Sequence, residues 1–198
     1  MIDLLYSIDK WLFCFLNQTL SNPFFDIIMP PITDWNITWI GRGIALTLWL
    51  LLFWRGGKRG RTVALLLIVL ILITDQLSTN FIKQYFARLR PCHKINDVAV
   101  VETVRLIAGV GCGGGYSFPS GHATNNIAFA TFISYYYPKW KWLAFSYGAL
   151  MALSRIFVGV HYPSDVLFGS LLGAFCALVL INIWKYISHL YPSLELNS

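Results

Sequence analysis

The chain has 198 residues, of which 57% are hydrophobic and only 12% are charged, and its formal net charge is +6. About 25% of the residues of a typical soluble domain are charged, so this chain has too few charges to cover a surface that faces water. The composition therefore excludes an ordinary soluble enzyme, a disordered chain and a protein that binds nucleic acid through a basic face. It indicates a helical membrane protein, which we expect to form a single domain over residues 1–198.

Residues 1–35 mix apolar and polar side chains in a pattern that gathers the apolar ones on one helical face. The Asn22-Pro23 and Pro30-Pro31 pairs are expected to break this segment. We predict one or two amphipathic helices that lie on the membrane surface. A true membrane span is the alternative that the pattern leaves open.

Five longer apolar stretches follow, within residues 36–190, and each is close to the ~20 residues that a membrane span needs. They cover residues 37–54, 63–81, 122–137, 142–160 and 163–184. The sequence therefore predicts an all-α bundle of about five transmembrane helices.

Basic residues in short loops predict the orientation of this bundle, because such loops stay on the cytoplasmic side. The loop at 55–61 holds four basic residues and no acidic one, Lys139 and Lys141 lie between the third and fourth stretches, and Lys185 follows the fifth. With five spans these places share one side. We expect the other side to face the periplasm, or the extracytoplasmic side, of an inner (plasma) membrane.

The segment 83–121 lies on the predicted outer side, yet it carries five basic residues and two acidic ones. Basic residues on this side need another purpose, and an anionic ligand is the simplest one. Arg88 has two interpretations: it contacts the head group of a substrate, or it meets the phosphates of the surrounding lipids.

Polar residues gather at the outer ends of four predicted spans, and the five-span topology brings these ends to one membrane depth. The residues are Lys83 and Arg90, then Pro119-Ser120-Gly121-His122, then Ser154-Arg155, and finally His161 and Asp165.

Three of these residues, Lys83, Arg90 and Arg155, are cations without enough acidic neighbours to pair with. Lys83 and Arg90 are seven residues apart, so they share one face of a helix. A single cation here would reach for the membrane surface, but three together favour an anion site. Ser120 and Gly121 stand at a predicted helix start, where free N–H groups attract anions, although a plain helix cap is the alternative.

His161 and Asp165 are four residues apart, one helical turn. A carboxylate at this distance holds one imidazole nitrogen and leaves the other free to attack phosphorus. His122 would protonate the leaving oxygen. Three cations supply the charge that the reaction needs, and no cluster of acidic residues stands at these ends, so we expect no metal ion and no cofactor.

These residues form three motifs: Lys83-x6-Arg90-Pro91, Pro119-Ser120-Gly121-His122 and Ser154-Arg155-x5-His161-x3-Asp165. Together the motifs resemble the signature of the type 2 phosphatidic acid phosphatase (PAP2) superfamily. The resemblance implies a helical bundle and metal-independent hydrolysis of a lipid phosphate through a phosphohistidine at His161. It implies that Asp165 supports His161 and that His122 is the general acid. The phosphate-binding residues that it implies are Lys83, Arg90, Ser120, Gly121 and Arg155. The same signature occurs in soluble vanadium haloperoxidases, against which the apolar stretches argue.

The motif residues do not indicate which lipid phosphate is the substrate. We favour undecaprenyl diphosphate or lipid A 1-phosphate, with phosphatidylglycerophosphate and phosphatidic acid as alternatives. A lipid-phosphate-binding or transport protein without catalysis is the second class, and the His161–Asp165 pair argues against it. The expected partners are the bilayer and its lipid phosphate, with no nucleic acid and no obligate protein partner.

Two further features have two interpretations each. Cys92 and Cys112 both fall in the outer segment, where a disulfide between them is our hypothesis and two free thiols are the alternative. Asp75 lies within the second apolar stretch. We expect it to make a structural hydrogen bond to a neighbouring helix rather than to take part in catalysis.

Overall fold

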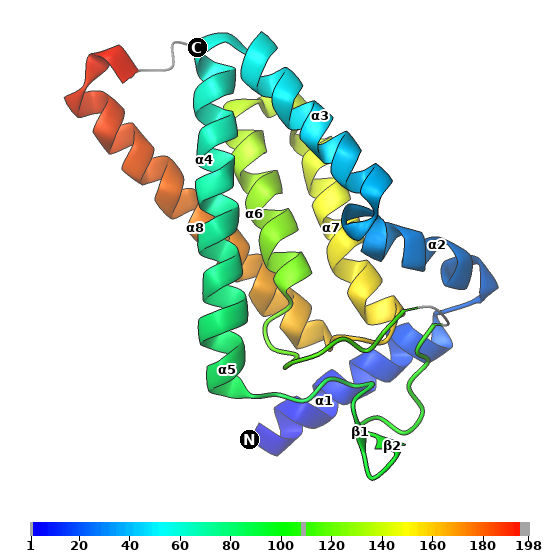
Figure 1. The fold of residues 1–198 in the computed structure, drawn as a ribbon. Helices are drawn as coiled ribbons and strands as arrows, with labels where there is room; N and C mark the ends of the chain where they lie inside the picture. Colours follow the sequence, from blue (N-terminus) through cyan, green and yellow to red (C-terminus); the bar gives the residue numbers. More distant parts are fainter. Residues whose placement is uncertain (1, 108–109, 195–198) are drawn as a thin grey trace.

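The computed structural model describes residues 2–107 and 110–194, and this part of the chain is a bundle of helices with one short hairpin (Figure 1). The fold class is that predicted, an all-α membrane protein. The main helices are α1 (Ile2–Cys14), α2 (Pro23–Asp34), α3 (Trp39–Arg55), α4 (Gly57–Asp75), α5 (Lys83–Phe86), α6 (Gly121–Tyr136), α7 (Lys141–Phe157) and α8 (Pro163–Leu190). The hairpin pairs β1 (Lys94–Ile95) with β2 (Val98–Ala99) in antiparallel register.

Helix α1 continues into a π-helical turn, η1 (Phe15–Thr19), and lies across the end of the bundle where α6 and α8 begin (Figure 1). Its apolar side chains face outward, and Leu4 and Trp11 are 63% and 67% exposed. Asp9, Phe13 and Asn17 are buried on the other side of this segment. Such a helix presents an apolar face to its surroundings, and for the α1 part of residues 1–35 we keep the proposal that it lies on the membrane surface.

The break predicted at Asn22-Pro23 is present, and α2 starts at Pro23. The Asn22 side chain caps this helix by accepting hydrogen bonds from the backbone N–H groups of Phe24 and Phe25. The prediction that Pro30-Pro31 breaks the chain is wrong, since both prolines lie inside α2. Proline removes a helical hydrogen bond, but its fixed φ suits a helix, and α2 continues past both prolines to Asp34. The break comes after Asp34, where the chain bends by 55° between α2 and α3.

Each of the five predicted apolar stretches forms a helix. Two of these are long and apolar enough to cross a membrane, Gly57–Phe86 and Pro163–Leu190, and the bent pair of α2 and α3 would be a third span. The first of them runs from α4 through a π-helical segment, η3 (Gln76–Ile82), into α5. Helix α6 has 16 residues and α7 has 17, so each reaches only about 25 Å. The count of five spans therefore stays a prediction.

Helix α6 lies at the centre of the bundle, between α4, α7 and α8 (Figure 1). Two glycines of α8 allow its close approach to α8: a Cβ at Gly173 would lie 2.1 Å from the Thr124 carbonyl oxygen, and one at Gly169 would lie 2.6 Å from that of Ser120. Small residues let helix backbones approach closely in membranes. This contact fixes the beginning of α6 against the beginning of α8, where the predicted site residues lie.

Candidate active site

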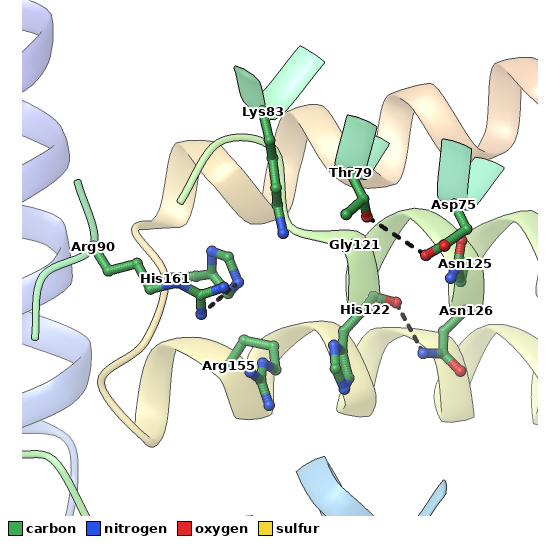
Figure 2. A pocket seen from close by; sticks show the side chains of 10 residues that line it. All are labelled: Asp75, Thr79, Lys83, Arg90, Gly121, His122, Asn125, Asn126, Arg155 and His161. Carbon is green, nitrogen blue, oxygen red and sulfur yellow. Dashed lines mark hydrogen bonds between the residues drawn. The ribbon is translucent and has the colours of Figure 1, made fainter. Parts of the chain in front are cut away.

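Figure 2 shows a cavity of about 270 Å³ at the end of the bundle that α1 crosses. It is lined by side chains from α4 and η3, α5, α6, α7 and the connecting loops. The lining residues are Asp75, Thr79, Lys83, Arg90, Gly121, His122, Asn125, Asn126, Arg155 and His161. Six of the eight predicted site residues are among them, so the convergence predicted from the topology is present.

The three predicted cations all reach the cavity. Arg90 and Arg155 are 6% and 8% exposed. Arg155 donates a hydrogen bond of 2.7 Å to the Thr33 hydroxyl and lies 3.6 Å from the Asp34 carboxylate. Among the described residues, no carboxylate lies within ion-pair distance of Lys83 or Arg90. Burial lowers the pKa of Arg90, but a guanidinium stays protonated in proteins, and the cavity therefore holds uncompensated positive charge.

His161 is almost fully buried in the turn between α7 and α8. Its Nδ1 atom lies 3.4 Å from Oδ2 of Asp165, and its Nε2 atom lies 3.5 Å from Nη1 of Arg90. A guanidinium only donates and a carboxylate only accepts, so this arrangement suits the tautomer with the proton on Nδ1. Burial and the charge of Arg90 lower the pKa of His161, although Asp165 opposes them, so the neutral ring is favoured, with its Nε2 atom facing Arg90.

Asp165 does not line the cavity but lies fully buried behind His161. It occupies the first turn of α8 and accepts a hydrogen bond of 2.8 Å from the backbone N–H of Tyr162. The Ser117 hydroxyl donates to the same carboxylate and lies 3.3 Å from Nδ1 of His161. We did not predict Ser117, because it lies outside the three motifs.

Arg88 holds the other oxygen of Asp165. Its Nη1 atom lies 2.8 Å from Oδ1 of Asp165 and 2.7 Å from the Ser164 hydroxyl, while its Nη2 atom lies 2.6 Å from Asp9 of α1. The guanidinium also lies 4.0 Å from the ring centre of Tyr162. Burial alone would lower the pKa of Arg88, but the charges of Asp165 and Asp9 raise it.

Both predicted roles of Arg88, a contact to a substrate head group and a contact to lipid phosphates, are wrong in the structure. The side chain points inward because α1 and α8 place two carboxylates beside it, and the sequence does not show that Asp9 is near. The geometry makes Arg88 a residue that positions Asp165.

Replacing Arg88 with methionine should lower kcat about 10- to 100-fold and change KM little. A hydrogen bond to a charged group contributes about 1.5–3 kcal/mol, which corresponds to such a change in rate. Steady-state kinetics of the purified protein checks this, with Arg61→Met, an exposed arginine of α4, as the matched control. A rise in KM with unchanged kcat would instead mean that Arg88 contacts the substrate.

The Pro119-Ser120-Gly121-His122 motif forms the start of α6, as predicted. Gly121 and His122 line the cavity, whereas Ser120 is fully buried beside it, and its backbone N–H donates to the Asp165 carbonyl oxygen at 2.9 Å. Within the described part of the chain, the Ser120 hydroxyl and Nε2 of His122 are buried without a hydrogen-bond partner. Both groups can therefore form a further hydrogen bond, and both lie next to the cations.

Asp75 lies in the cavity wall, and the prediction of a hydrogen bond to a neighbouring helix is wrong for the described residues. Its carboxylate accepts one hydrogen bond, of 3.5 Å, from Thr79 on the next turn of its own helix. Thr79, Asn125 and Asn126 also line the cavity and were not predicted. The sequence does carry a signal for Thr79, because Asp75, Thr79 and Lys83 follow each other at four-residue intervals, as residues on one helical face do.

The predicted disulfide between Cys92 and Cys112 is present. Cys92 is two residues from Arg90, and Cys112 precedes Gly113, where a Cβ would lie 3.6 Å from the Arg90 guanidinium carbon. Gly113 also has a φ of +73°, which other residues rarely adopt. The disulfide thus joins the two loop segments that enclose Arg90.

Replacing both Cys92 and Cys112 with serine should raise KM about two- to tenfold and change kcat less. Without the disulfide Arg90 must be ordered when the phosphate binds, and immobilising one such side chain costs about 0.5–1.5 kcal/mol. The measurement is KM of the oxidised protein and of the double variant, with Cys14→Ser, a free cysteine outside the site, as control. An unchanged KM would show that the loops hold Arg90 without the bond.

The fold and the cavity define a helical membrane protein with a buried cavity lined by three cations. Residues 64–188 match the family model described as the PAP2 superfamily, and the chain therefore belongs to this superfamily. The resemblance drawn from the three motifs is confirmed, and the chain is a PAP2-type lipid phosphatase.

Relatives and a solved structure agree with this assignment. A lipid A 4'-phosphatase of Porphyromonas gingivalis is 32% identical over 190 residues, which cover 93% of this chain and 76% of that protein. An undecaprenyl-diphosphatase of Sulfolobus acidocaldarius is 32% identical over 141 residues, which cover 71% of this chain and 62% of that protein. The crystal structure of Aquifex aeolicus LpxE superimposes with a TM-score of 0.68 at 25% identity, covering 86% of this chain and 93% of that one.

Proposed function

We propose that the protein hydrolyses a lipid phosphate in two steps through a phosphohistidine at His161. The observation that carries this proposal is the buried His161–Asp165 pair, in which the Nε2 atom of His161 faces a cavity lined by Lys83, Arg90 and Arg155. A site that only binds phosphate needs the cations, but it does not need a neutral imidazole oriented by a carboxylate.

In the first step Nε2 of His161 attacks phosphorus, so that a P–N bond forms and the bond from phosphorus to the ester oxygen breaks. His122 donates a proton to the leaving oxygen. Asp165 stabilises the positive charge that develops on the imidazole. In the second step a water molecule gives a proton to His122 and attacks phosphorus, and the P–N bond breaks. Inorganic phosphate is released and neutral His161 is restored.

Charge on the phosphoryl oxygens is stabilised by the three cations and by donors at the start of α6. Ser120 contributes a hydroxyl that has no partner among the described residues, and Gly121 leaves the backbone accessible. Preorganised donors in a buried site are effective because they need not reorient during the reaction.

Activity should be unchanged after treatment with EDTA and dialysis into metal-free buffer. Three cations already supply the charge that a metal ion would bring, and the described residues contain no group of three or more His, Cys, Asp or Glu side chains placed to hold one. Phosphate release is measured before and after treatment. Loss of activity that Mg²⁺ restores would contradict the metal-free mechanism.

We propose that the site opens to the periplasmic or extracytoplasmic side of the inner membrane. The basic residues of 55–61 lie at the opposite end of α4, at the last residue of α3 and in the first turns of α4 (Figure 1). The outward apolar face of α1 lies at the site end of the bundle. A lipid substrate would keep its tails in the bilayer and present its phosphate to the cavity.

For the substrate we propose a phosphate group of lipid A, with undecaprenyl diphosphate as the second candidate, because relatives with these two activities are each 32% identical to this chain. The test is phosphate release by the detergent-purified protein from lipid A, undecaprenyl diphosphate, phosphatidylglycerophosphate and phosphatidic acid. Release by the wild type but not by His161→Ala supports the proposal, and the ranking identifies the substrate. No release from any lipid by folded protein would favour the binding or transport alternative.

A further inference from the structure

The cavity has two ends of different chemistry (Figure 2). His161 and Arg90 stand at one end, and Lys83, Arg155 and His122 lie in the middle. The other end is formed by uncharged polar side chains and one carboxylate: Thr79, Asn125, Asn126 and Asp75. The phosphate chemistry of the proposed function uses the first end and the middle, and it leaves the second end without a role.

The proposed reaction places the leaving group at this second end. A nucleophile attacks phosphorus opposite to the leaving oxygen, with both roughly in line. His161 attacks from the Arg90 end, so the leaving oxygen points away from it, toward His122. Any group attached to that oxygen extends past His122, where α6 presents Asn125 and Asn126 and α4 presents Asp75 (Figure 2).

The side chains at this end have hydrogen-bonding capacity that the described residues do not use. The Asn125 amide oxygen accepts from Thr74 at 2.8 Å, which leaves its NH₂ group available. The Asn126 NH₂ group donates to the His122 carbonyl oxygen at 2.8 Å, which leaves its amide oxygen available. Asp75 is exposed toward the cavity and holds only the 3.5 Å contact from Thr79.

Free donors and acceptors within a membrane bundle are costly, and they mark a place where a polar ligand binds. Asp75 also indicates which charge that ligand can carry. A carboxylate attracts hydroxyl donors and repels a second phosphate, and this repulsion is strong where little water is present.

We propose that Asp75, Thr79, Asn125 and Asn126 form a leaving-group subsite that binds an uncharged, hydroxyl-bearing group such as a sugar ring. This inference rests on the proposed function and makes it more specific. The subsite selects phosphate monoesters of a sugar over diphosphates, because hydrolysis of a diphosphate would place a phosphate leaving group beside Asp75.

The test uses two isosteric variants that change the charge of the subsite in opposite directions. We measure kcat/KM for lipid A and for undecaprenyl diphosphate with the full-length, detergent-purified protein. The ratio of the two values should fall about tenfold in Asp75→Asn and rise in Asn125→Asp. Asn125→Asp keeps the acceptor for Thr74, and Asn80→Asp, an exposed residue of η3 outside the cavity, is the matched control.

A binding measurement separates this inference from the proposed function. In the His161→Ala background, the ratio of dissociation constants for the same two lipids should shift with the two charge variants as the kcat/KM ratio does. If no lipid is hydrolysed but this shift persists, the hydrolysis fails and the subsite stands. If both variants change both lipids by the same factor, in kinetics and in binding, the subsite inference is overturned.

Discussion

Replacing His161 with alanine should lower phosphate release by at least about 10⁴-fold while the affinity for phosphate stays within a few-fold of the wild type. Loss of an enzyme nucleophile removes nearly all turnover, whereas the cations that hold the anion remain. His161 is the only described histidine in contact with a carboxylate of the site, so no other imidazole replaces it. Phosphate release and the binding of inorganic phosphate are measured on the same preparation.

The matched control is His189→Ala, because His189 lies exposed near the end of α8 that is remote from the site. A phosphorylated protein trapped from the wild type, and absent from His161→Ala, would identify the intermediate directly. Its presence in both proteins would place the covalent step on another residue.

Replacing Asp165 with asparagine should lower kcat about 10³- to 10⁴-fold with a smaller change in KM. The amide keeps the shape of the side chain, but it removes the charge that stabilises the imidazolium and fixes its tautomer. The carboxylate also accepts from Arg88, Ser117 and the Tyr162 backbone N–H, so the variant leaves Arg88 partly unpaired. Kinetics and thermal unfolding are measured together.

A double variant and a control variant show whether the loss in Asp165→Asn comes from its contact with His161. The double variant of Asp165→Asn with Arg88→Met should be scarcely slower than Asp165→Asn alone, because Arg88 acts through the carboxylate. Additive losses would mean that Arg88 has a separate task. Asp97→Asn, in the exposed hairpin turn, is the control for loss of a carboxylate.

The sequence predicted the site well where the helix ends determine it. Lys83, Arg90, Arg155 and His161 are brought together by topology, because the helices run up and down and bring α5, the start of α6, the end of α7 and the start of α8 to one end of the bundle (Figure 1). The disulfide followed from two cysteines in one outer segment. These predictions needed only the order and the alternating direction of the helices, which the apolar stretches of the sequence indicate.

The predictions that were wrong concern contacts that depend on side-chain direction. Arg88 differs from Arg90 only by two positions, but it pairs with Asp9 and Asp165 because α1 crosses the end of the bundle. Asp75 was assigned a structural bond because an acid within the membrane needs a partner. The structure instead turns it toward the cavity, and helical spacing alone does not tell which neighbour a face meets.

The pairing of Arg88 with Asp9 also bears on where the functional unit of this chain begins. The match to the family covers residues 64–188, and the first signature residue is Lys83. Asp9 lies more than fifty residues upstream of that match, yet it bonds to Arg88 and, through its carboxylate, to the backbone N–H of Ser164 at 2.9 Å. A boundary drawn from the signature alone would divide one continuous hydrogen-bonded network, which runs from the first helix through Arg88 and Asp165 to His161.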